Sequence, residues 1–106
     1  MGVTQPIDIT SDQRELILGL LEDYLPNVTV WIYGSRIKGT TRAQSDLDMV
    51  VFTVHGQEAH VSNLKEAFEE SNLPFRVDLF RWDEVPENFR ATIQKEHVVL
   101  IGEWNK

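Results

Sequence analysis

The spacing of hydrophobic residues divides this chain into alternating helices and strands. Between residues 14 and 25 apolar residues recur at steps of three and four, which predicts an amphipathic helix. Thr10 and Gln13 have the spacing of a capping box at the start of this helix, and Pro26 ends it. Its apolar stripe consists of Leu16, Ile17, Leu20, Leu21, Tyr24 and Leu25. We expect this helix to cover the core and to carry no chemistry.

Strands are predicted where β-branched and aromatic residues run together or alternate with polar ones. The predicted strands are residues 28–33, 47–54, 75–82 and 98–101. Helical spacing returns in residues 58–72 and 87–96, and in the second of these helices Phe89 and Ile93 are expected to face inward. Strands that alternate with helices predict an α/β or α+β fold.

The composition is that of one soluble globular domain, which we expect to span residues 1–106. Hydrophobic residues make up 42% of the chain and charged residues 25%, and 106 residues suffice for one core. No apolar run is long enough to cross a membrane and the first residues lack the pattern of a signal peptide, so a cytoplasmic protein is predicted. The absence of cysteine excludes disulfides and thiolate metal sites, and the three histidines have no zinc-ligand spacing.

The formal charge of −7 disfavours binding to long nucleic acids, because proteins bind these largely through Lys and Arg contacts to phosphates. One segment departs from this acidity. Arg36, Lys38 and Arg42 lie in a stretch from residue 24 to residue 45 that contains no acid. Such a basic patch is compatible with a mononucleotide, and we predict that Arg36 and Lys38 contact phosphate. The alternative for both is solvated surface charge.

Asp46 and Asp48 open the second predicted strand, and their spacing places both side chains on one face at a Cα distance of roughly 6.6 Å. Two carboxylates at that separation repel by about 2.5 kcal/mol at an effective dielectric constant near 20. A divalent cation removes this repulsion, and Mg²⁺ binds one or two carboxylates together with substrate phosphates. Alternation in the third predicted strand places Arg76, Asp78 and Phe80 on one face. If the two faces are shared, three carboxylates converge.

A Gly-Ser turn follows the first predicted strand and can supply the phosphate-binding half of such a site. Gly34 lets the backbone turn sharply and approach a ligand, the Ser35 hydroxyl can donate a hydrogen bond, and the following N–H groups favour an anion. Ser45, directly before the first acid, is a further candidate for phosphate binding. Each motif alone has a structural alternative, since residues 45–46 also fit an Asx-type turn.

Together, residues 34–35 and the Ser-Asp-Leu-Asp of residues 45–48 resemble the Gly-Ser…Asp-x-Asp signature of the polymerase-β-like nucleotidyltransferase superfamily. The superfamily has a third acid on a later strand, and Asp78 in Arg-Val-Asp-Leu-Phe matches it. These marks span residues 28–80, and at 106 residues the chain is similar to the stand-alone minimal nucleotidyltransferases. The resemblance implies a mixed β-sheet with helices packed mainly on one face.

The resemblance also implies an activity, namely Mg²⁺-dependent transfer of a nucleoside monophosphate from a nucleoside triphosphate to an acceptor hydroxyl with release of pyrophosphate. We expect AMP from ATP, although no residue spacing distinguishes adenine from guanine. Asp46 and Asp48 would then hold Mg²⁺, Asp78 would help to bind a second metal ion and accept the proton of the acceptor, and residues 34–35 would clamp the triphosphate. Minimal members often act beside a small helical protein, either a HEPN toxin in a toxin–antitoxin system or a substrate-binding subunit. The alternative is a catalytically silent subunit that binds a nucleotide or a protein and neutralises its partner by contact.

Overall fold

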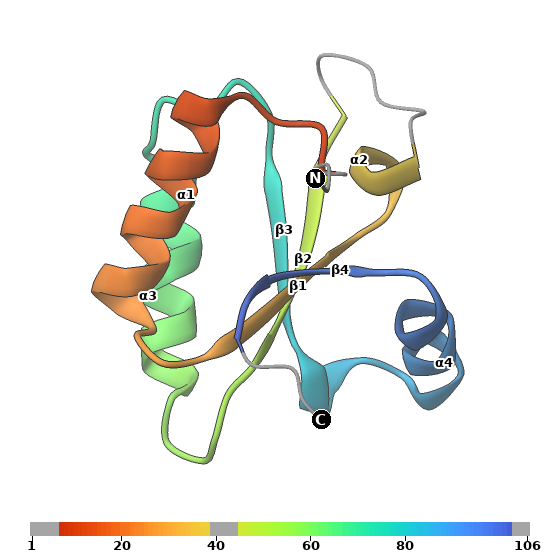
Figure 1. Ribbon diagram of the computed structural model, residues 1–106. Helices are drawn as coiled ribbons and strands as arrows, with labels where there is room; N and C mark the ends of the chain where they lie inside the picture. Colours follow the sequence, from red (N-terminus) through yellow and green to blue (C-terminus); the bar gives the residue numbers. More distant parts are fainter. Residues whose placement is uncertain (1–6, 39–44, 103–106) are drawn as a thin grey trace.

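The computed structural model describes residues 7–38 and 45–102 (Figure 1). In chain order these residues form α1 (Ser11–Tyr24), β1 (Thr29–Tyr33), α2 (Ser35–Lys38), β2 (Leu47–Phe52), α3 (Glu58–Glu69), β3 (Val77–Arg81), the 3₁₀ turn η1 (Trp82–Glu84), α4 (Glu87–Lys95) and β4 (Val98–Ile101). This order confirms the predicted alternation, although β2 and α3 end slightly earlier than predicted. Within the two described ranges, no helix has the length and apolar composition needed to span a membrane.

The four strands form one mixed sheet in the order β3-β2-β1-β4. β1 pairs antiparallel with β2 on one side and with β4 on the other, whereas β2 and β3 are parallel. A parallel pair needs a crossover connection, and α3 supplies it. β1 and β2 are therefore the inner strands, and β3 and β4 form the two edges of the sheet.

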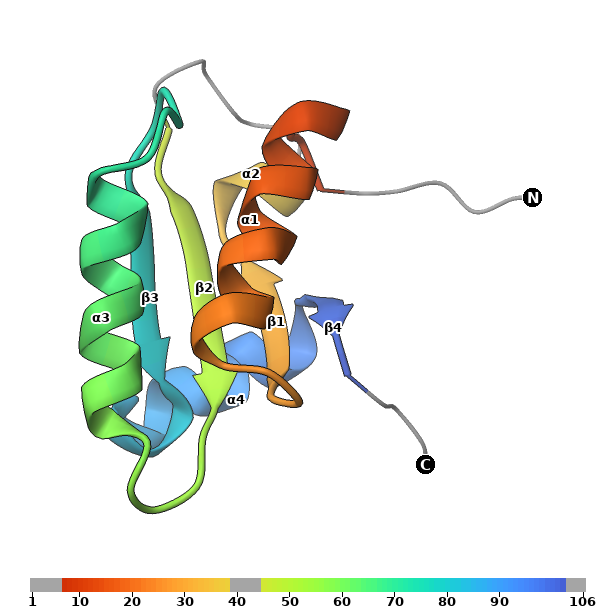
Figure 2. The same cartoon turned by 90° about the vertical axis from the view of Figure 1, so that its left-hand side faces the viewer.

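α1 and α3 lie side by side on one face of the sheet, and α4 lies on the opposite face (Figures 1 and 2). The main core fills the space between the first two helices and the sheet. Its fully buried members include Ile17 and Leu21 of α1, Leu64 of α3, and Leu47 and Met49 of β2. The expected mixed sheet with helices mainly on one face is thus confirmed.

The predicted start of α1 is also confirmed. The hydroxyl of Thr10 accepts a hydrogen bond from the Gln13 N–H at 3.1 Å, and the side-chain oxygen of Gln13 accepts one from the Thr10 N–H at 2.9 Å. This capping box satisfies donors that the helix itself leaves unpaired. α1 thereby begins at a defined residue and reaches along the sheet as far as Tyr24.

A second, smaller cluster of apolar residues lies on the face of the sheet that α4 covers. Ile93 of α4 is buried there, as predicted, together with Tyr33 of β1. Trp31 packs against Phe52 with 4.6 Å between ring centres, so it is a packing residue. The prediction that Phe89 faces inward is wrong, because α4 reaches this cluster through Ile93. The Phe89 side chain is 41% exposed, and its ring forms a T-shaped pair with that of Tyr33, with 5.8 Å between the ring centres.

Candidate active site

The three acids that the sequence analysis singled out lie on one face of the sheet, where the parallel pair begins. Asp48 of β2 and Asp78 of β3 are direct register partners, and Asp46 comes just before β2 with the same alternation as Asp48. Directly opposite residues of neighbouring strands direct their side chains to the same face. Their neighbours Leu47 and Met49 point into the main core, so the acids face the opposite side of the sheet.

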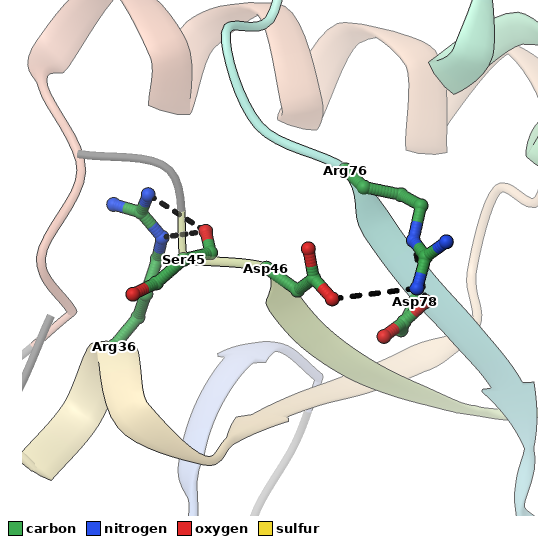
Figure 3. Close-up of polar contacts among 5 residues, drawn as sticks. All are labelled: Arg36, Ser45, Asp46, Arg76 and Asp78. Atoms are coloured by element: carbon green, nitrogen blue, oxygen red, sulfur yellow. Dashed lines mark hydrogen bonds and ion pairs between the residues drawn. The ribbon is translucent and has the colours of Figure 1, made fainter. Parts of the chain in front are cut away.

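Arg76 lies between two of these acids (Figure 3). Its Nη2 is 3.4 Å from Oδ2 of Asp46, and its Nε is 3.2 Å from Oδ1 of Asp78. The side chain of Arg76 is 68% exposed, and exposed ion pairs contribute only about 0–1 kcal/mol. Arg76 therefore offsets part of the repulsion between the acids but can be displaced at small energetic cost.

Burial and clustered charge together change the pKa of Asp48. Burial first, and then the negative charges of Asp78 and Asp46, raise the pKa of Asp48 from 3.8 to about 6. Tyr33 is the cross-strand partner of Asp48 on β1 and is itself buried. The pKa of its hydroxyl is raised to about 12, mainly by burial and further by Asp48 and Asp78. Negative charge is thus concentrated in a partly desolvated site.

Gly34 brings the turn after β1 against this cluster. Its φ is +87°, and a Cβ at this position would overlap Oδ2 of Asp48. Glycine alone combines easy access to this conformation with the absence of a Cβ. The sequence predicts that Gly34 lets the backbone approach another group closely. Among the described residues, that group is the carboxylate of Asp48.

Arg36 makes contacts with the backbone that the sequence does not predict. Its guanidinium is buried, and Nε and Nη2 donate to the carbonyl of Ser45 at 3.1 and 2.9 Å (Figure 3). Nη1 donates to the carbonyl of Asp8 at 2.8 Å. The guanidinium also lies 4.0 Å from the centre of the Phe75 ring. These contacts tie the chain entering β2 to distant segments. We infer that Arg36 has a positioning role for Ser45 and the adjoining Asp46, and its contact with phosphate stays a prediction.

The other predicted phosphate contacts are only partly described. Ser35 is the first residue of α2, directly after the Gly34 turn, and Ser45 directly precedes the first acid. The side chain of Lys38 and the whole of Arg42 lie outside the described residues. Contacts of Ser35, Ser45 and Lys38 with phosphate stay predictions.

Two further residues, Arg76 and Tyr33, belong to the site although the sequence motif does not include them. Arg76 contacts two of the acids, and Tyr33 is buried beside Asp48. The only sequence signals for these two residues were their positions relative to the motif. Arg76 lies two residues before Asp78 on the same strand face, and Tyr33 directly precedes the Gly-Ser turn.

The donor set fits a hard divalent cation. Carboxylate oxygens are the ligands that Mg²⁺ and Mn²⁺ prefer. Burial, and then the charges of Asp78 and Asp46, disfavour the ionised form of Asp48 and raise its pKa, and a bound cation would offset this cost. No ready-made cage of three acidic or histidine side chains is present within residues 7–38 and 45–102. Instead, the guanidinium of Arg76 lies between Asp46 and Asp78. Asp46, Asp48 and Asp78 are the residues that would hold a cation once Arg76 rotates away.

Comparison with known proteins identifies the family of this chain. A family model described as polymerase beta nucleotidyltransferase matches residues 15–105. The chain belongs to this family. This nucleotidyltransferase is 40% identical over 95 residues to the "Probable protein adenylyltransferase MntA" of Haemophilus influenzae, an alignment that covers 89% of the chain and 83% of that protein. Nucleotidyltransferases of this kind generally use divalent metal ions, in agreement with the carboxylate donor set.

Solved structures share the fold of this nucleotidyltransferase. A chain of a toxin–antitoxin complex with AMP-PNP matches it with a TM-score of 0.70 at 23% identity, over 85% of this chain and 73% of that one. A chain of the complex between a tri-AMPylated Shewanella oneidensis HEPN toxin and an MNT antitoxin matches with a TM-score of 0.54 at 15% identity, over 90% and 74% of the two chains. At these identities the likeness shows the fold alone.

The pKa of Asp48 leads to a testable prediction about pH. Between about pH 4 and pH 6 the folded chain binds more protons at Asp48 than the unfolded chain, so the stability contributed by this group falls as the pH rises through that window. In an NMR titration of the metal-free protein, the Asp48 carboxyl carbon is expected to titrate near pH 6. Asp78→Asn should lower that midpoint. A wild-type midpoint near 4 would contradict the burial of Asp48, and an unchanged midpoint in Asp78→Asn would contradict the charge clustering.

A second prediction concerns the buried arginine. Arg36→Met removes three hydrogen bonds to backbone carbonyls, and hydrogen bonds to charged groups contribute about 1.5–3 kcal/mol. We expect the free energy of unfolding in urea to fall by about 3 kcal/mol, after part of the loss is recovered by solvation. Arg76→Met is the matched control and should change it by less than about 1 kcal/mol, because Arg76 is mostly exposed. Equal losses in the two variants would contradict the positioning role.

Proposed function

We propose that this nucleotidyltransferase transfers AMP from ATP to a hydroxyl group of a protein, with Mg²⁺ as the metal ion. The observation that carries the proposal is the pairing of Asp48 with Asp78 across the parallel strands, with Asp46 on the same face. Support for a protein acceptor comes from the 40% identity to a protein adenylyltransferase.

The proposed roles come from the family resemblance, and the positions of the residues support them. Asp46 and Asp48 hold the metal, which when bound supplies positive charge for the α-phosphate and for the leaving pyrophosphate. The acceptor oxygen bonds to the α-phosphorus while the bond from that phosphorus to the oxygen bridging to the β-phosphate breaks, and pyrophosphate leaves with the electron pair. Asp78 accepts the proton of the acceptor hydroxyl. The turn at Gly34 and Ser35 holds the triphosphate, since this turn already contacts the carboxylate of Asp48.

The proposed acceptor is a small helical HEPN-type protein, with which this chain would form a toxin–antitoxin pair in the cytoplasm. Proteins of the same fold occur in toxin–antitoxin complexes, and in one of these the HEPN toxin carries AMP groups. Covalent AMP adds a bulky, negatively charged group to a hydroxyl side chain. Attached near a functional site of the toxin, such a group would inactivate it.

A second candidate function is that of a silent subunit that neutralises its partner by contact. The observation in its favour is the guanidinium of Arg76 between Asp46 and Asp78, because an arginine that stayed there would exclude a metal ion. Because Arg76 is mostly exposed, its ion pairs with the acids are weak. We therefore favour the enzyme over the silent subunit.

Label transfer tests the proposed function. The chain is mixed with a HEPN-type protein encoded in the same genome and with ATP labelled at either the α- or the γ-phosphate, in Mg²⁺ or in EDTA. We expect label on the HEPN-type protein only from the α-phosphate and only with Mg²⁺. A stable complex that acquires no label would support the silent subunit, and label from the γ-phosphate would indicate phosphoryl transfer instead.

A further inference from the structure

The outer edge of β3 lies directly beside the candidate active site. β3 is an end strand of the sheet, and among residues 7–38 and 45–102 no strand pairs with its outer side. Asp78 projects from this strand. Free strand edges can accept an added strand through main-chain hydrogen bonds, which is a common way of binding extended peptides.

The backbone of β3 presents alternate residues to this edge. The N–H of Leu47 donates to the carbonyl of Arg76 at 2.9 Å, and the parallel register with β2 continues along β3. Because the backbone groups of successive residues point to opposite sides of a strand, the even-numbered residues of β3 face β2. The N–H and C=O groups of Val77, Leu79 and Arg81 therefore point outward, away from the sheet.

A groove of about 290 Å³ follows the same edge. It is lined by residues 76–80 and by Lys65 and Glu69 of α3. Consecutive residues of a strand direct their side chains to opposite faces of the sheet. Because residues 76–80 all line the groove, the groove must lie along the outer edge of β3 rather than on one face of the sheet. Within this lining Phe80 is 42% exposed and projects on the same face as Asp78.

We propose that an extended segment of the acceptor protein binds in this groove as a fifth strand, with its reacting hydroxyl residue directly opposite Asp78. This inference rests on the proposed function and adds how the protein acceptor is recognised. Directly opposite residues of neighbouring strands have Cβ atoms about 4.5–5.5 Å apart and side chains on the same face. The hydroxyl thus reaches Asp78 from the free side of β3, while Asp48 lies on the other side, toward the nucleotide.

The register also defines a preference for the acceptor sequence. Phe80 is the next residue of β3 on the face of Asp78, so the acceptor residue two positions from the hydroxyl lies opposite an exposed aromatic ring. An apolar side chain is expected there. Charged side chains at and just before this short strand disfavour its pairing with strands of arbitrary sequence. They belong to Arg76, Asp78 and Arg81.

Residue-resolved amide exchange tests the added strand without requiring catalysis. The ¹⁵N-labelled chain is measured by NMR with Mg²⁺ and AMP-PNP, alone and with the HEPN-type protein. We expect the outward amides of Leu79 and Arg81 to exchange at least about tenfold more slowly in the complex. The amides of Asp78 and Phe80, which already face β2, should change much less. Unchanged exchange at Leu79 and Arg81 in the complex overturns the inference. The inference also fails if these two amides become protected when the concentration of the chain alone is raised, because a second copy of the chain would then occupy the edge.

Kinetics separates this inference from the proposed function. Phe80→Ser should raise the KM for the HEPN-type protein by at least about tenfold and leave the KM for MgATP unchanged. Val54→Ser is the control, because Val54 is also an exposed apolar residue but lies in the loop after β2 rather than at the β3 edge. If the wild type transfers no AMP, the proposed function fails. If it transfers AMP and Phe80→Ser behaves as Val54→Ser does, the docking inference alone fails.

Discussion

Asp48→Asn is expected to lower the rate of AMP transfer by about 10²–10³-fold and, at the same time, to stabilise the fold. The loss of activity follows because the amide cannot supply the anionic oxygen that a metal ion needs, and loss of one preorganised electrostatic group has about this effect. The gain in stability follows because the folded chain holds an ionised Asp48 unfavourably above pH 6. The full linkage energy of such a pKa rise is about 3 kcal/mol, and we expect about 1–2 kcal/mol because solvent screens a half-buried group.

Urea unfolding at pH 7.5 in EDTA measures the stability, and label transfer in Mg²⁺ measures the activity. Asp23→Asn serves as the control, because Asp23 is an exposed acid on α1, which packs on the opposite face of the sheet. It should change neither quantity appreciably. An inactive Asp48→Asn protein that is also less stable than the wild type would indicate damage to the fold rather than loss of a metal ligand.

Gly34→Ala is expected to impair both folding and transfer. A non-glycine residue at a φ of +87° carries about 1–2 kcal/mol of backbone strain, and the added Cβ would also collide with the carboxylate of Asp48. We expect the free energy of unfolding to fall by about 2–4 kcal/mol. Displacing Asp48 should slow transfer by about 10–100-fold, since small misplacements of reacting groups have effects of this size.

Gly56→Ala separates backbone strain from the collision. Gly56 has a φ of +94°, but a Cβ there would meet no other atom within 4 Å. This variant should lose only the strain energy, about 1–2 kcal/mol, and should keep its activity. If the two glycine variants have equal effects on transfer, the contact between Gly34 and Asp48 is not needed for catalysis.

Local patterns were sufficient to predict the elements of the fold. The capping box of Thr10, the three- and four-residue spacing after it and the apolar runs of β1 and β2 each depend on neighbouring residues, and these elements were found where expected. The order and direction of the strands depend on contacts between distant segments. The mixed sheet was therefore predicted only through the family resemblance. Phe89 was misplaced because helical spacing shows that a face is apolar, whereas the packing of α4 decides how much of it is covered.

In the site too, local patterns predicted some features, while others depend on contacts between distant segments. The two-residue spacing of Asp46 and Asp48 already implies a shared face, but the pairing of Asp48 with Asp78 depends on β2 and β3 being neighbours in register. Arg36 was predicted to contact phosphate because it lies in a basic segment, but its contacts with backbone carbonyls were not predicted. Its acceptor on Asp8 is 28 residues away in the sequence, and no local pattern reports such a contact.

The intact mass of the acceptor tests the central claim, that the three acids act as one catalytic site, most directly. The HEPN-type protein is incubated with MgATP and with wild-type chain, the three single Asp→Asn variants at positions 46, 48 and 78, or the triple variant. We expect the wild type to add the mass of AMP, and each single variant to lose nearly as much rate as the triple variant, because groups that act as a unit have non-additive effects. Addition of AMP at the wild-type rate by the triple variant would contradict the claim.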